Sequence, residues 1–130
     1  MPLSDQDRKI IFDKVKNVLK KFSPPMAIAK DKEDVFELMG NKPVPYGSKK
    51  VTVPGMYFSS VVARKDMISY YFFPMYMDHG SYDPILVNSK KYLKGKTCFN
   101  YKKVDQVDEK ELSAILKKGV TVWKKLGYMN

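Results

Sequence analysis

The chain has 130 residues, of which 44% are hydrophobic, so it is long enough for one domain with a buried core and too apolar for an intrinsically disordered protein. Its 24 Lys and Arg residues against 14 Asp and Glu residues leave a net charge of +10, which favours acidic partners such as nucleic acid or phosphorylated ligands. One cysteine excludes an internal disulfide, and the lack of an apolar signal stretch or a run of about 20 apolar residues predicts a cytoplasmic protein that does not enter a membrane.

The first predicted element is a helix that begins after Ser4 and ends before Pro24. Ser4 is a suitable N-cap, and Asp7 three residues later forms a variant of the capping box. Apolar residues recur at helical spacing along the segment, at Ile11, Val15, Val18 and Phe22. This pattern predicts an amphipathic helix with one buried face.

The central part of the chain predicts strands, although residues 26–34 show no clear pattern. Val35–Met39 is a short candidate strand, and the proline-rich loop Lys42–Ser48 that follows is unsuited to a central strand. Met56–Ala63 and Met67–Phe73 are rich in β-branched and aromatic residues, and the short connection between them predicts an antiparallel hairpin. Both runs carry bulky side chains on both faces, so either helices cover both faces of the sheet or one face lines a groove.

The next predicted elements follow a loop at Asp78–Asp83. Residues Pro84–Leu93 predict a short helix, and Gly95 is a suitable residue to end it. Thr97–Lys102 alternates in the manner of a strand.

The last element is the clearest helix. Asp108 is a candidate N-cap with Glu111 three residues later, and Gly127 is suited to end the helix. Gly119, in the middle of the helix, lowers helix stability by about 1 kcal/mol relative to alanine. The apolar stripe of this helix comprises Leu112, Ile115, Leu116, Trp123 and Leu126. Together the elements predict an α+β fold over residues 1–130, in which a small antiparallel sheet of about four strands is flanked by N- and C-terminal helices.

Residues 89–103 form the first candidate site, because this stretch contains six lysines interspersed with three aromatic residues and has no acidic residue. Lysines contact phosphates as point charges and aromatic rings stack on bases, so the mixture suits single-stranded nucleic acid or a phosphorylated ligand. The alternative is a solvated lysine face with its aromatic residues in the core. The candidate contacts are Tyr92, Lys94, Lys96 and Lys102.

An aromatic cluster over residues 57–82 forms the second candidate site. It contains eight Tyr and Phe residues, among them Tyr57 and Tyr71, which suits a pocket with apolar walls and a few hydroxyl groups. The alternative is an aromatic core between the sheet and the helices.

Two further side chains carry reactive groups. His79, the only histidine, lies between Asp78 and Asp83, which suits a metal ligand or an acid/base as well as ordinary turn chemistry. Cys98 is either a nucleophile among lysines or a small buried hydrophobic residue in a strand.

Three short motifs, Met56–Phe58, Tyr71–Tyr76 and Tyr92–Phe99, resemble those of the YdhG-like family of small bacterial domains of unknown function. The likeness spans most of the chain and implies one compact α+β domain with an antiparallel sheet and flanking helices. Some members of the family are described as frataxin-like iron chaperones, a role that implies an acidic face. The first predicted helix carries three acidic and six basic residues, whereas a hard cation needs clustered oxygen ligands, so iron handling is kept only as an alternative.

We therefore expect a non-enzymatic binding or accessory module that uses a basic, aromatic-rich surface to contact an anionic ligand or nucleic acid. One alternative is an enzyme or small-molecule-binding protein with a Tyr-lined pocket near Tyr57, Tyr71 and His79, and another is metal handling. The sequence predicts no catalytic residue, metal ligand or cofactor. The residues expected at the contact are Lys94, Lys96, Lys102, Tyr92, Tyr57 and Tyr71.

Overall fold

The computed structural model describes residues 3–46 and 51–129, with the backbone alone described for Tyr46 and His79. The structure contains two long helices. Along the chain, α1 (Asp5–Lys20) precedes all the strands and α3 (Glu109–Lys125) follows them. The strands are β1 (Ala27–Lys32), β2 (Val35–Met39), β3 (Val44–Tyr46), β4 (Val51–Val53), β5 (Tyr57–Ala63), β6 (Ile68–Phe72), β7 (Leu93–Lys94) and β8 (Cys98–Tyr101). Shorter elements are the helix α2 (His79–Tyr82) and the 3₁₀ turns η1 (Phe73–Tyr76), η2 (Lys90–Tyr92) and η3 (Val104–Gln106).

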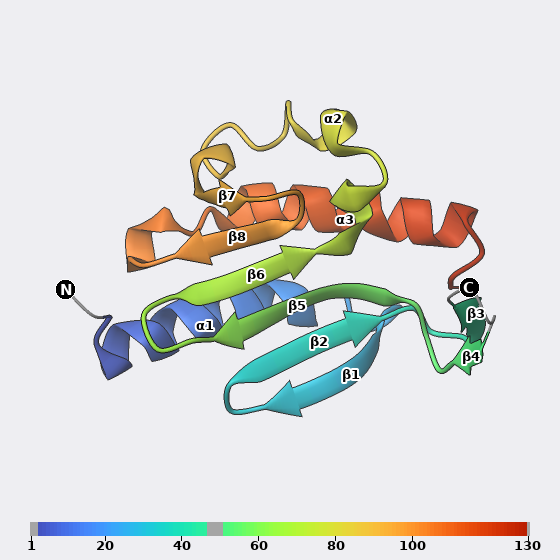
Figure 1. The fold of residues 1–130 in the computed structure, drawn as a ribbon, viewed down its shortest axis with the longest axis horizontal. Coiled ribbons are helices and arrows are strands. Elements are labelled where there is room, and N and C mark those ends of the chain that lie inside the picture. Colours follow the sequence, from blue (N-terminus) through green and yellow to red (C-terminus); the bar gives the residue numbers. More distant parts are fainter. Residues whose placement is uncertain (1–2, 47–50, 130) are drawn as a thin grey trace.

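Six of these strands form one sheet in the order β1-β2-β5-β6-β8-β7, and every neighbouring pair is antiparallel. Figure 1 shows this sheet lying in front of the two long helices. Strands β3 and β4 pair separately as a two-stranded hairpin at one end of the molecule. The architecture is therefore α+β, with the N- and C-terminal helices packed on an antiparallel sheet.

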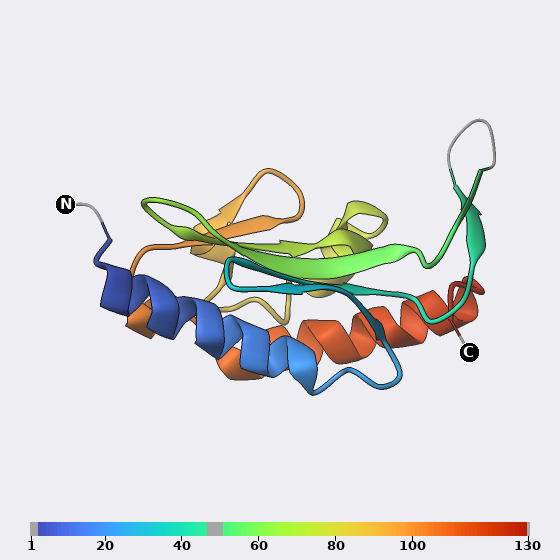
Figure 2. The same cartoon turned by 90° about the horizontal axis from the view of Figure 1, so that it is seen from below.

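Both long helices lie against the same face of the sheet (Figure 2). The strand residues on that face alternate with those on the other face, as the pleat requires. The helix-facing residues that are fully buried are Phe36, Leu38, Phe58, Val61, Ile68, Tyr70, Phe72, Phe99 and Tyr101. Each such side chain stabilises the fold by about 1.5–3 kcal/mol, so the core lies between the sheet and the helix pair.

The ends of the helices are fixed by local hydrogen bonds. The Ser4 hydroxyl accepts from the Asp7 N–H at 3.1 Å, and the Asp108 carboxylate accepts from the Glu111 N–H at 3.0 Å. Gly127, at φ +82°, ends α3. The next residue donates its N–H back to the Trp123 carbonyl at 2.9 Å, as in a Schellman motif. The caps predicted from the sequence are thereby confirmed.

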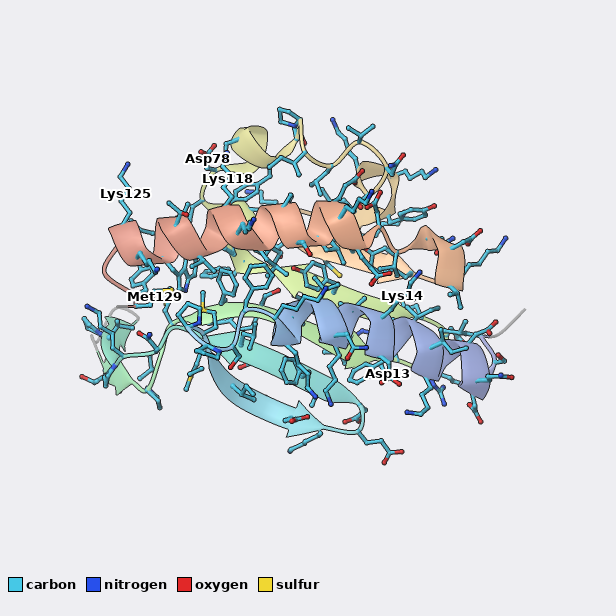
Figure 3. All side chains as sticks on the ribbon, turned by 180° about the vertical axis from the view of Figure 1, so that it is seen from behind. Asp13, Lys14, Asp78, Lys118, Lys125 and Met129 are labelled. Atoms are coloured by element: carbon cyan, nitrogen blue, oxygen red, sulfur yellow. The ribbon has the colours of Figure 1, made fainter. Side chains whose placement is uncertain are left out.

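The helices also meet each other and the chain between them. Seen from behind, α1 and α3 run side by side over the sheet (Figure 3). The Lys14 ammonium of α1 donates to the Val104 carbonyl of η3 at 3.2 Å, and Lys118 of α3 donates to the Ser81 carbonyl of α2 at 3.0 Å. These contacts tie the short elements to the helix pair.

The structure confirms the predicted strands at β2 and β8 and the hairpin β5–β6, but the predicted sheet of about four strands is too small. Residues 26–34, which showed no pattern, supply the edge strand β1, whose side chains are exposed beyond its first residue and therefore do not alternate. Strand β7 is the second addition and has two residues. The loop predicted over 42–48 contains β3 in its described part, and residues 47 and 48 lie outside the described residues.

The helix predicted over Pro84–Leu93 is wrong. The α-helical turn is α2, which ends at Tyr82, and the predicted segment contains turns, η2 and the start of β7. The carboxylate of Glu111 in α3 accepts the N–H groups of Asn88 and Ser89, each within 3.1 Å, so tertiary contacts hold this segment in place of its own helical bonds. Gly95, expected to end a helix, lies at φ +73° in the turn between β7 and β8.

Candidate ligand-binding face of the sheet

The face of the sheet opposite α1 and α3, called the open face below, is not covered by either long helix (Figure 2). Residues that pair directly across neighbouring strands point to the same side. One row of paired residues crosses all six strands on this face: Lys30, Glu37, Ser60, Tyr71, Cys98 and Lys94. At a strand spacing of about 4.8 Å the row is about 24 Å long.

A polar network lies at the middle of the open face. Arg64, at the end of β5, donates from Nε to the Ser69 hydroxyl at 3.0 Å and from Nη2 to the Tyr71 hydroxyl. Ser69 donates in turn to Asn100 Oδ1 at 2.9 Å, and the Cys98 thiol contacts the same oxygen at 3.5 Å. The network holds one of the two arginines of the chain against the sheet. These bonds use two of the five N–H donors of a guanidinium group.

Three aromatic rings line one end of the open face. The rings of Tyr57 and Phe73 lie 5.8 Å apart, and those of Phe73 and Tyr76 stack at 5.9 Å with an interplanar angle of 20°. Tyr76 is 60% exposed, and the Lys96 ammonium lies 5.3 Å from the centre of its ring. The Tyr57 hydroxyl shares a hydrogen bond of 2.6 Å with that of Ser60, so its ring is fixed on the sheet.

Burial governs the protonation of two groups on this face. Burial raises the pKa of the Cys98 thiol, and the nearby Tyr71 hydroxyl and Arg64 guanidinium offset this only in part. Burial also raises the pKa of Tyr57 well above its usual range. Both groups are therefore neutral near pH 7, and Cys98 is not an activated nucleophile. The charge of the open face comes from its Lys, Arg and Glu side chains.

The structure brings together four of the six predicted contact residues. Tyr57 and Tyr71 lie on the open face, Lys94 shares the row of Tyr71, and Lys96 lies in the adjoining β7–β8 turn. Tyr92 packs its ring 5.8 Å from that of Tyr101, which belongs to the helix-facing core.

The remaining predicted contact, Lys102, follows the last residue of β8 and so lies at the opposite end of this strand from Lys94. The lysine-rich stretch 89–103 is thus divided between two places. The aromatic cluster over residues 57–82 is divided as well, because Phe58, Tyr70, Phe72 and Tyr82 are buried in the core.

Sequence reasoning missed Arg64, Ser69 and Asn100 as members of this surface. Arg64 reads as part of a turn, and the other two are small polar residues within predicted strands. Only the pairing of β6 with β8 brings Ser69 opposite Asn100. Polar residues at every second position of a strand indicate which residues share one face of that strand. They do not indicate which strand lies beside it.

The other predicted sites gain no support. His79 begins α2, and its side chain lies outside the described part of the structure. Among the described residues no group of three or more His, Cys, Asp or Glu side chains is arranged to hold a metal ion. Two cavities, of about 740 and 610 Å³, lie beside the N-termini of α1 and α3, and neither is lined by Tyr57 or Tyr71.

Comparisons of the chain with protein-family models, with curated proteins and with solved structures gave no match. Within the described part of the chain, no helix has both the length and the apolar composition needed to cross a membrane.

Proposed function

We propose that this protein is a non-enzymatic binding module whose open face takes an anionic ligand. The observation that carries the proposal is the charge of that face. Its described strand positions hold three lysines, Lys30, Lys32 and Lys94, against one carboxylate, Glu37. Arg64 and Lys96 add two cations from the adjoining turns.

Among the described residues, these cations form no ion pair with a carboxylate within 4 Å. The ion pairs among the described residues involve Arg8, Lys9, Lys14, Lys16 and Lys90, and none involves the five open-face cations. Lys30 and Glu37 are directly opposite in the sheet, yet they form no ion pair within 4 Å. Like charges on one face repel one another, so an anion that binds there relieves the repulsion and gains attraction from several cations at once.

The form of the surface suits binding more than catalysis. The polar groups at its centre bond to one another, and its thiol is held neutral by burial. Lysines act as flexible point charges, whereas Arg64 presents a fixed planar group that suits a phosphate or carboxylate.

Retention on a heparin column at low salt tests the proposal. In the variant Lys94→Glu/Lys96→Glu each change removes two charges, so the net charge falls from +10 to +6. The matched control Lys117→Glu/Lys124→Glu makes the same change at two exposed positions of α3, on the other side of the molecule.

We expect the wild type and the control to elute at similar salt concentrations and the open-face variant to elute much earlier. Failure of the wild type to bind heparin at low salt, or an equal loss in both variants, would contradict the proposal.

A further inference from the structure

We propose that the anionic ligand of the open face is single-stranded nucleic acid, with one base stacked on Tyr76; this rests on the function proposed above. Tyr76 presents the most exposed aromatic ring of the described residues, at 60%. An exposed aromatic ring beside cations is the kind of platform on which proteins that bind single strands stack a base.

The ring stack gives Tyr76 a fixed orientation. The ring of Phe73 stacks on that of Tyr76, with 5.9 Å between the ring centres and nearly parallel planes. The Phe73 ring in turn contacts the ring of the core residue Trp123, with 6.1 Å between their centres. A base that stacks on Tyr76 would extend this stack by one ring, without ordering a flexible side chain first. Base stacking on such a platform tolerates any base, because every base has a π-face.

The cations lie where the backbone of a stacked strand would pass. Lys96 lies 5.3 Å from the Tyr76 ring centre, and Lys94 lies two residues earlier, at the opposite end of the row from Lys30. Arg64 bonds to the Tyr71 hydroxyl in the middle of this row. When a base takes the place of Lys96 above the Tyr76 ring, the Lys96 ammonium can turn to the adjacent phosphate. The row of about 24 Å is long enough for several nucleotides.

The same features disfavour other anions. A duplex hides the faces of its bases, and reading its grooves relies on arginine, of which the chain has two. A small phosphate compound would leave the far end of the row, at Lys30, without a partner. A sulfated or carboxylated polymer would use the lysines but not the ring of Tyr76.

Fluorescence anisotropy with labelled 12-nucleotide strands tests the inference, using oligo(U), oligo(dU) and an abasic strand of equal length. We expect Tyr76→Ala to weaken binding of the two base-containing strands about 5- to 140-fold and to leave the abasic strand unaffected. Tyr76→Phe should bind as the wild type does, because it keeps the ring. Circular dichroism of both variants verifies that they fold.

The double variant Lys94→Glu/Lys96→Glu should weaken binding to all three strands and reduce the slope of log K against log salt by about 1.4, since each lost phosphate contact on a single strand contributes about 0.7. Equal binding of abasic and base-containing strands, with no effect of Tyr76→Ala, would overturn the inference and leave the proposed function intact. Absence of binding to any strand, with heparin still retained, would also overturn the inference alone. Failure of the wild type to bind heparin at low salt would overturn both. Oligo(U) and oligo(dU) share the base and differ at the sugar, so tighter binding of one of them would support the inference and identify RNA or DNA as the favoured strand.

Discussion

Adding one methyl group to Gly119, in the middle of α3, is predicted to destabilise the protein. A Cβ atom at this position would lie 2.8 Å from the rings of both Phe58 and Phe72. Both rings are fully buried and make an edge contact with each other. Phe58 also makes an edge contact with Trp123 and Phe72 with Tyr82, so neither ring can move without disturbing the core. Overpacking a core costs about 1–3 kcal/mol, and Gly119→Ala belongs at the upper end of this range because the added methyl group meets two fixed rings. The gain in helix propensity from Gly to Ala is about 1 kcal/mol. The net loss in the free energy of unfolding is therefore about 1–2 kcal/mol.

Thermal and urea unfolding of Gly119→Ala, followed by circular dichroism, would measure this loss. For a domain of this size it corresponds to a fall in Tm of about 4–8 °C. Thr121→Ala, at an exposed position two residues further along the same helix, is the control, and it should be neutral or slightly stabilising. If Gly119→Ala raised the Tm, α3 would not approach the sheet at this point and the packing described above would be wrong.

Two further predictions concern the loop beside α3 and the thiol of the open face. Glu111→Ala should lower the free energy of unfolding by about 1–3 kcal/mol and speed amide exchange at Ser89, because it removes the acceptor of the N–H group of this buried residue. Glu109→Ala, in the same turn, is the control, and equal losses in both variants would argue against the anchor. Cys98 should react with iodoacetamide more slowly than a free cysteine near pH 7, because burial raises the pKa of its thiol and the reactive thiolate forms only at more alkaline pH. A rate–pH midpoint at or below that of a cysteine peptide, measured by mass spectrometry, would refute this.

The helices and their ends could be predicted because the signals for them are local. The caps at Ser4 and Asp108 and the glycine at the end of α3 act within a few residues of the sequence, and the apolar stripes follow the helical period. Strand β1 could not be predicted in this way, because its side chains are exposed on both faces and leave no period-2 pattern. Segment 84–93 was misassigned because Glu111, more than 20 residues later, determines its conformation.

The candidate site was predicted in its composition but not in its position. The sequence pointed to lysines beside tyrosines, and Lys94, Lys96, Tyr57 and Tyr71 do meet at the open face. Which residues share that face depends on strand order and register, and a shift of one residue would move every side chain to the other side. The same pairing places Lys102 at the far end of β8.

The proposed function requires that anions bind the sheet face left uncovered by the helices. Backbone amide NMR spectra recorded during titration with a single-stranded oligonucleotide or heparin test it most directly. We predict shifts at Tyr71, Cys98 and Lys94, with Lys117 and Lys124 on α3 unchanged. Shifts confined to α1 and α3, with the residues of β6, β7 and β8 unmoved at saturating ligand, would contradict the account.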